Sequence, residues 1–424
     1  MKNTYCMNGY TLHLIPTDKF KTTTISLRLQ SPLTREETTL RSLLTFVLIS
    51  ATESLPSTPL LSQRLEDHYG ASLSAHIASK GQAHIMNVTT SFVNDLYLPQ
   101  KENLLEKQLH LLNDLFFHPL IKGGGFDKDI VEIKKKELRE RLQANKDDKF
   151  SYSLDKLFEY MGQDQPLGIS STGYEEDLDK ITPESLYQYL LKCIEEDEKH
   201  IYVVGDIDRS IVDLFKECLV FPTHDKHYLS AYAFESNHKD VSEFIEKQDV
   251  TQSKLNLGYT INCDFTSEKH YAMTVFNAIF GGFSQSRLFK VVRETHSLCY
   301  YVSSSYAAFS GVMIVNAGID AKNYEKTKSL IQEQLQDLQN GNITDEEIEV
   351  AKILLQNSLK KTEDEASSMI TLAYNRDITN TKESHEEYIQ KLLNVSKEDI
   401  IKVSQDVHLD TIFFLTGKDF YENH

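Results

Sequence analysis

The chain has 424 residues, 40% of them hydrophobic and 25% charged, a composition typical of folded globular proteins and too long for one ordinary core. Its formal net charge of −18 at pH 7 repels phosphate backbones and anionic bilayers, so we expect no nucleic-acid or membrane partner. The five scattered cysteines form no CxxC, and the first residues carry no apolar run of signal-peptide length. We therefore expect a cytoplasmic protein with reduced thiols.

The hydrophobic pattern, followed in chain order, changes repeatedly between the period of a strand and that of a helix. Period-two alternation predicts strands at residues 25–29, 73–78, 84–90, 255–259 and 312–318. Helical periodicity predicts helices at residues 101–117, 152–161 and 323–340. Strands and helices in both halves of the chain indicate an α+β fold.

An internal repeat, with an offset of roughly 210 to 230 residues, divides the chain. Residues 126–138 align without gaps on residues 343–355, and both segments are typical of an acidic first turn entering a long amphipathic helix. Three further pairs keep the same order: residues 25–29 with 255–259, 181–186 with 395–400, and 201–205 with 412–417. We therefore predict two similar α+β domains, residues 1–222 and 245–424, joined by a linker at residues 223–244.

The most specific motif lies in residues 281–302, where Gly-Gly is followed by Ser-Arg-Leu-Phe, then Val-Arg-Glu, then Leu-Cys-Tyr. This motif resembles a segment in the C-terminal domain of the pitrilysin/insulinase family of metallopeptidases, also called inverzincins. That family is built from duplicated α+β domains of about this size. The resemblance implies one half of a clam-shell peptidase, with each domain a sandwich of helices and a mainly antiparallel sheet.

The resemblance also implies a role for Arg293 and Tyr300, which match an Arg and a Tyr of the family seven residues apart. Peptide hydrolysis builds negative charge on the carbonyl oxygen, and a guanidinium and a phenol in a water-poor cavity can donate to it. We expect both residues to be catalytic and substrate-binding, with Arg293 near a helix end and Tyr300 at the start of a strand. Arg287, His296 and Cys299, in the same motif, are expected to be structural.

Family members that hydrolyse peptides bind Zn²⁺ through H-x-x-E-H on an early helix and a Glu on a later one. Here no two of the 15 histidines are four residues apart, and none lies between His13 and His68. The matching positions hold Ser42, Leu43, Leu44, Thr45 and Phe46, and the third-ligand position holds Arg141. Hydroxyls, hydrocarbons and a guanidinium are poor zinc ligands, so we predict no metal site in this chain.

Three other patterns carry no predicted chemistry. His224 and His227 form an H-x-x-H in a polar stretch that we interpret as a solvated loop. The acidic run at residues 195–198 is predicted to be a solvated helix end. Residues 123–125 are three glycines without the Lys and Ser/Thr of a phosphate-binding loop, which argues against nucleotide binding.

The chain has donors for an oxyanion but no zinc ligands. This combination predicts a zinc-free subunit of a heterodimeric metallopeptidase, similar to the zinc-deficient chain of bacterial processing-peptidase pairs. Such a chain would hold no cofactor and would be inactive alone. It would bind a peptide substrate together with a homologous subunit that carries HxxEH and holds the zinc, and it would act on that peptide in trans. The first alternative is a non-catalytic peptide-binding or scaffold protein of the same fold. The second is an autonomous peptidase with another metal site. The isolated chain could form a homodimer, but neither copy would bring the zinc ligands.

Overall fold

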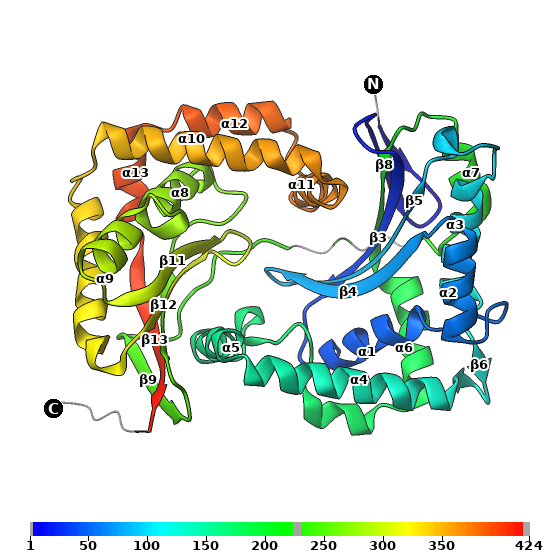
Figure 1. Cartoon of the computed structure of the whole chain (residues 1–424), viewed down its shortest axis with the longest axis horizontal. Coiled ribbons are helices and arrows are strands. Elements are labelled where there is room, and N and C mark those ends of the chain that lie inside the picture. Colours follow the sequence, from blue (N-terminus) through cyan, green and yellow to red (C-terminus); the bar gives the residue numbers. More distant parts are fainter. Residues whose placement is uncertain (1–2, 224–226, 228–229, 419–424) are drawn as a thin grey trace. The chain divides into compact units, whose positions relative to one another are not determined.

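The computed structural model describes residues 3–223, 227 and 230–418. The chain divides into two compact units. Unit 1 comprises Met1–Gln143, Ser170–Leu229 and Thr362–Asn375, and unit 2 comprises Ala144–Ile169, Ser230–Lys361 and Arg376–His424. Each unit contains one large, mostly antiparallel sheet with helices packed on it (Figure 1), which confirms the predicted α+β fold.

Unit 1 is built on a six-stranded sheet in the order β1-β2-β8-β3-β5-β4, in which only β2 and β8 run parallel. The strands are β1 Thr4–Cys6, β2 Thr11–Pro16, β3 Thr22–Pro32, β4 Ser72–Lys80, β5 Ala83–Val93 and β8 Glu198–Gly205, with a separate hairpin of β6 Ile121–Lys122 and β7 Gly125–Phe126. The α-helices are α1 Thr38–Leu48, α2 Thr58–Asp67, α3 Leu104–Phe117, α4 Lys128–Asp147, whose end enters unit 2, α6 Pro183–Glu196 and α7 Ile211–Cys218. Short 3-10 helices are η1 Asp95–Tyr97, η3 Glu175–Lys180 and η7 Thr362–Asp364.

Unit 2 is built on a five-stranded sheet in the order β11-β12-β10-β13-β9, in which only β13 and β9 run parallel. The strands are β9 Ser242–Gln248, β10 Ser253–Thr260, β11 Cys299–Ala307, β12 Val312–Ile319 and β13 His408–Gly417. The helices are α5 Lys149–Gly162, η2 Pro166–Gly168, α8 His270–Asn277, η4 Ala278–Gly282, η5 Phe289–Thr295, η6 Ala321–Asn323, α9 Tyr324–Gln339, α10 Asp345–Lys361, α12 His385–Leu393 and α13 Lys397–Ser404. Helix α11 Ala366–Ile378 belongs mostly to unit 1, and its last residues enter unit 2. In the described ranges, no helix is long and apolar enough to cross a membrane.

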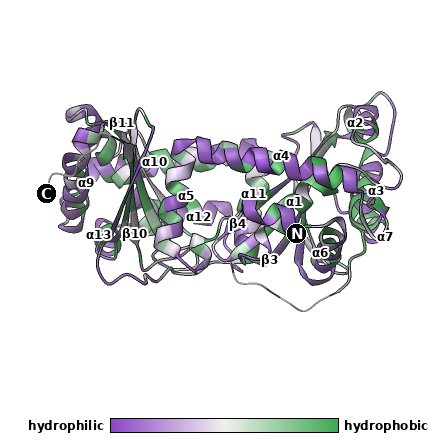
Figure 2. Ribbon diagram, turned by 90° about the horizontal axis from the view of Figure 1, so that it is seen from below, coloured by the Kyte–Doolittle hydropathy of each residue, from purple (hydrophilic) through white to green (hydrophobic). Residues whose placement is uncertain are grey.

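The main core of unit 1 lies between one face of its sheet and helices α1, α3 and α6. Alternate residues of the central strands, such as Leu27, Leu29 and Val88, are fully buried there. Burying one such side chain contributes roughly 1.5–3 kcal/mol to folding. Figure 2 shows the same division in unit 2, with strand β10 largely hydrophobic and helix α9 largely hydrophilic on the outside.

The internal repeat is confirmed as a duplication of structure. The strand order β2-β8-β3-β5-β4 of unit 1 recurs in unit 2 as β9-β13-β10-β12-β11. Helices α4 and α10 begin at Lys128 and Asp345, equivalent positions of the aligned segments. Helices α6 and α13 follow Thr182 and Ser396, and both N-caps form capping boxes. The predicted boundaries at residues 222 and 245 stay a prediction, and His224 with most of the linker's first residues lies outside the described residues.

Each half of the sequence lends a helix to the sheet of the other half (Figure 1). Helix α5 packs on β10 and β13 of unit 2, where a Cβ at Gly258 would lie 2.6 Å from the Met161 sulfur. Glycine therefore lets α5 approach the strand closely. The part of α11 that belongs to unit 1 covers β3, and the Tyr374 hydroxyl donates to Gln30 Oε1 at 2.5 Å. The two compact units consequently interleave in sequence.

A buried ion pair joins α1 to the end of α6. Arg41 is fully buried and donates to the Asp197 carboxylate, to the carbonyl of Leu29 at 3.2 Å and to the Tyr189 hydroxyl at 3.3 Å. The prediction that residues 195–198 form a solvated helix end is wrong for Asp197, which is 4% exposed. A buried guanidinium is strongly stabilised by a carboxylate partner, which accounts for the inward position of the acidic C-cap residue of α6.

Replacing Arg41 by Met should lower the free energy of unfolding by about 3–5 kcal/mol, because the Asp197 carboxylate would stay buried without its partner. Arg35→Met is the matched control, since Arg35 pairs with Glu176 and Asp177 at the surface, and its loss should cost about 1 kcal/mol or less. Urea unfolding followed by circular dichroism measures both, because the chain has no tryptophan. Equal losses in the two variants would contradict the assignment.

Candidate functional site

The motif of residues 281–302 forms two π-helical segments, η4 and η5, that lead into strand β11. π-Helices are rare and occur frequently at functional sites. A Cβ at Gly281 would lie 2.6 Å from the backbone nitrogen of Ser304, so only glycine allows η4 to pack this closely on β11. The hydroxyl of Ser304 donates to Asn277 Oδ1 at 2.7 Å, which further holds the segment against the strand.

Arg293 and Tyr300 lie at the two ends of the connection between η5 and β11. Arg293 is exposed near the end of η5, with its guanidinium 4.6 Å from the centre of the Phe289 ring. Tyr300 is 67% exposed and lies at a β-bulge, because the pairing of β11 with β12 shifts between Cys299 and Tyr301. A bulge frees one residue from the ladder and often redirects its side chain. The predicted places of both residues are confirmed, while their chemical role stays a prediction.

The turn between these two residues is tight. Ser297 adopts a left-handed conformation with φ of 51°, and its N–H donates to the Arg293 carbonyl at 3.0 Å. Burial raises the pKa of the Cys299 thiol to about 11, and the positive charge of Arg293 acts against this rise. Arg293 therefore lies close to the first residue of β11. In the described part of the chain, neither Arg293 nor Tyr300 has an ion-pair or hydrogen-bond partner for its side chain, so their donors face solvent.

Arg287 fixes the motif to the start of α10. Its guanidinium forms a two-point ion pair with Glu347, at 2.6 and 2.9 Å, and also donates to the Asn342 carbonyl. Burial alone would raise the pKa of the Glu347 carboxyl, but the hydrogen bonds from Arg287 and Thr344 outweigh it and lower the pKa to about 2. Arg287 is structural, as the sequence analysis expected. His296 is exposed, whereas Cys299 is buried.

The ion pair predicts a specific pH dependence of stability. The folded-state pKa of Glu347 lies below its ordinary value of 4.5, so the pair stabilises the fold fully above about pH 5 and progressively less as the pH falls toward 2. Glu347→Gln should lower the free energy of unfolding by about 2–3 kcal/mol at neutral pH. Urea unfolding of both proteins from pH 7 downward should show this difference shrinking below pH 5. A difference independent of pH would contradict the assignment.

The positions that the sequence predicts to match the zinc ligands of active family members lie on α1 and α4 of unit 1. Ser42 and Thr45 are buried on α1, and the Thr45 hydroxyl donates to the Ser42 carbonyl at 2.7 Å. The Arg141 guanidinium lies 5.8 Å from the centre of the Phe46 ring. Phe46, at the predicted position of the second histidine, therefore lies close to Arg141, at the predicted position of the third ligand.

A guanidinium, a benzene ring and two hydroxyls do not fit Zn²⁺, which prefers imidazole, thiolate and carboxylate ligands. Over residues 3–223, 227 and 230–418, no group of three or more His, Cys, Asp or Glu side chains is arranged to hold a metal ion.

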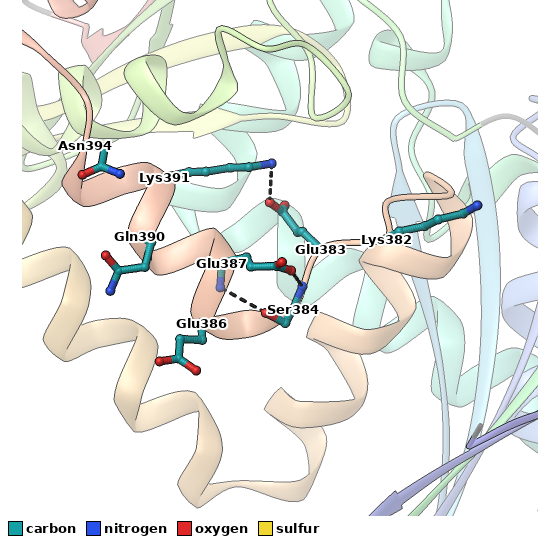
Figure 3. Close-up of a pocket in the computed structure, with 8 residues that line it drawn as sticks. All are labelled: Lys382, Glu383, Ser384, Glu386, Glu387, Gln390, Lys391 and Asn394. Carbon is teal, nitrogen blue, oxygen red and sulfur yellow. Dashed lines mark hydrogen bonds and ion pairs between the residues drawn. The ribbon is translucent and has the colours of Figure 1, made fainter. Parts of the chain in front are cut away.

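A hollow of about 820 Å³ in unit 2 lies along α12 (Figure 3). Its polar groups already serve the helix: Lys391 pairs with Glu383 at 2.9 Å, and Glu387 forms a capping box with Ser384. It contains none of the residues singled out from the sequence. It is lined by Lys382, Glu383, Ser384, Glu386, Glu387, Gln390, Lys391 and Asn394.

The sequence analysis did not single out a row of polar side chains on the second face of the unit 1 sheet. His76, Asn87 and Arg28 are paired directly across β4, β5 and β3. An arginine and an asparagine near the middle of two largely buried strands were the available signal, because a face covered by a second layer is usually apolar.

Comparison with known proteins identifies the family of the chain. The family model described as the peptidase M16 inactive domain matches residues 180–355. The chain is 36% identical over 419 residues to the probable inactive metalloprotease YmfF of Bacillus subtilis, covering 97% of this chain and 96% of that protein. The chain belongs to the M16 peptidase family. The pitrilysin/insulinase resemblance seen in the motif is thereby confirmed.

Two further similarities extend over most of the chain. A zinc protease of Bacillus subtilis, YmxG, described as uncharacterized, is 27% identical and covers 74% of this chain and 73% of its own length. The crystal structure of a conserved protein from Enterococcus faecalis V583 shares 33% identity and a TM-score of 0.91, with full coverage of both chains.

Proposed function

We propose that this M16 chain is the zinc-free subunit of a heterodimeric metallopeptidase and supplies Arg293 and Tyr300 to a zinc-bearing partner chain. The observation that carries the proposal is a contrast within the chain. The donors Arg293 and Tyr300 are exposed on a shaped segment, whereas the zinc-ligand positions hold Ser42, Phe46 and Arg141. Alone, the chain would not hydrolyse peptides.

The chemistry follows from the two side chains. A guanidinium is permanently charged and offers five N–H donors, and a phenol offers one O–H. Both would donate to the carbonyl oxygen of the scissile peptide as it becomes an oxyanion. Zinc held by the partner would supply the activated water. Because the Arg287–Glu347 pair already anchors the motif, little conformational entropy would be lost when the substrate binds.

Two further observations support the proposal. Bacillus subtilis contains both a relative named as a probable inactive metalloprotease and a relative named as a zinc protease, so the two kinds of M16 chain occur in one organism. All five cysteines are free, and four of them are buried, which suits a reducing compartment and the proposed action in the cytoplasm. The partner would process or degrade peptides, with this chain completing the site.

Co-expression of the chain with the HxxEH-bearing M16 chain of its own genome should produce cleavage of fluorogenic peptides. Arg293→Ala should then lower kcat about 100- to 1,000-fold, the typical loss of an oxyanion donor, and Tyr300→Phe should also lower it. The matched control is Lys290→Ala, which removes an exposed cation from the same helical segment and should leave the rate unchanged.

Unchanged activity in the Arg293→Ala mixture would refute the catalytic role. In another outcome, the mixture binds peptide while its cleavage rate stays the same after Arg293 or Tyr300 is replaced. That result would favour the alternative, a non-catalytic peptide-binding or scaffold protein.

A further inference from the structure

The second face of the unit 1 sheet is polar, in contrast to the apolar face that packs on α1. His76, Asn87 and Arg28 stand in one row across β4, β5 and β3. Side chains paired in this way on one face lie about 5 Å apart from strand to strand. Three groups that donate hydrogen bonds therefore lie within reach of one small ligand.

Arg28 is only 8% exposed, yet it has no carboxylate partner in the described part of the chain. One terminal nitrogen donates to the Thr371 hydroxyl at 3.2 Å, and the guanidinium lies 4.5 Å from the centre of the Tyr374 ring. Its Nε has no hydrogen-bond partner. A buried guanidinium without a counter-charge is costly, which is why buried arginines are normally paired. An anion at this position would remove that cost.

Asn87 is 4% exposed, and its carboxamide has no hydrogen-bond partner among the described residues. Unlike Arg28 Nε, the amide atoms of Asn87 are not fully covered by protein, so they are open to a ligand or to solvent. On the same face, the carboxylate of Glu198 is already engaged by His200 at 3.3 Å and His227 at 3.0 Å. Both the amide and the guanidinium are thus left with unused donors at neighbouring positions.

The duplicated fold shows that these residues are not required by the architecture. The repeat aligns Arg28 with Gly258 of β10, and the strand position paired with Gly258 is Ile314. In unit 2 this face is apolar and is covered by α5. The same sheet position therefore packs stably without any charge, and the polar row of unit 1 is an addition that a ligand would account for.

Arg28 gives the row a fixed positive charge, although the net charge of the chain is −18. Burial and the neighbouring Arg28 lower the pKa of Lys80 to about 8. Burial, followed by the charges of Arg28 and Arg141, also lowers the pKa of His76. The charge of Arg28 thus acts on both Lys80 and His76, and the imidazole of His76 is held in its neutral form at pH 7.

We propose that Arg28, Asn87 and His76 form a binding site for a carboxylate group of a peptide on this face of unit 1. A carboxylate has two acceptor oxygens and suits a guanidinium, an amide N–H and an imidazole N–H together. The carboxylate would come from an acidic side chain or from the C-terminus of the peptide. The choice of a peptide rests on the proposed function, whereas the choice of a carboxylate rests on the donors alone.

The test uses the full chain without a partner, so its outcome is separate from that of the cleavage experiment. Fluorescence anisotropy measures the binding of a fluorescein-labelled peptide of alternating Glu and Gly as the chain is added. Three modified peptides are measured in the same way: one with Gln in place of Glu, one with an amidated C-terminus, and one with both changes. The unmodified peptide should bind, and the doubly modified one should not. Loss on Glu-to-Gln replacement alone identifies side-chain carboxylates, and loss on amidation alone identifies the C-terminus.

Arg28→Met and Asn87→Ala should each weaken binding by about tenfold or more, because a charge-assisted hydrogen bond is lost. His76→Ala, at the exposed edge strand, tests the site without disturbing a buried position. The control is Arg139→Met, since Arg139 is already paired with Asp179 at 2.6 Å, and it should bind like the unaltered chain. Equal affinity for acidic and doubly modified peptides, or unchanged affinity in Asn87→Ala and His76→Ala, would overturn the proposal.

Discussion

A guanidinium lies beside a benzene ring at the positions that the sequence predicts to match the zinc ligands of active M16 peptidases, and much of this account depends on that arrangement. Arg141 and Phe46 come from different helices, so their proximity at 5.8 Å is a property of the fold. A fixed positive charge repels a divalent cation, and neither group has a lone pair to offer it. Restoring zinc would require several replacements at once, so this site differs chemically from a weakened zinc site.

In the proposed function, the second unit supplies the other half of the chemistry. A π-helix, a left-handed turn at Ser297 and a bulge at Tyr300 present one guanidinium and one phenol to solvent. Such irregular backbone is less favourable than a regular helix and strand, and here it is held by close packing at Gly281 and by the Arg287–Glu347 pair. A structured segment with exposed donors is what a subunit acting in trans would need to provide.

Much of the fold could be predicted from the sequence because the relevant signals are local. The starts of α4 and α10, the capping residues Thr182 and Ser396, and strands β4, β5 and β12 all follow from periodicity and end signals. The exchange of α5 and α11 could not be predicted, since an amphipathic helix does not encode which sheet its apolar face will cover. The close approach at Gly258 is visible only once both partners are placed.

The candidate site residues also divide into those that a local motif indicates and those that only the fold brings together. Arg293 and Tyr300 were found because a short, contiguous motif carries them. Asp197 was misjudged, because its partner Arg41 is distant in sequence and the acidic run around it is typical of a solvated surface. The row of Arg28, Asn87 and His76 was missed for the same reason: strand order and register, which no local pattern specifies, bring its three members together.

The most direct test of the central claim is the zinc content of purified protein, measured by elemental analysis on the isolated chain and on its complex with an HxxEH-bearing M16 chain. The account predicts well below one zinc per isolated chain and about one zinc per complex, because a single set of ligands is present in the pair. Tightly bound zinc in a ratio near one to the isolated chain would contradict it.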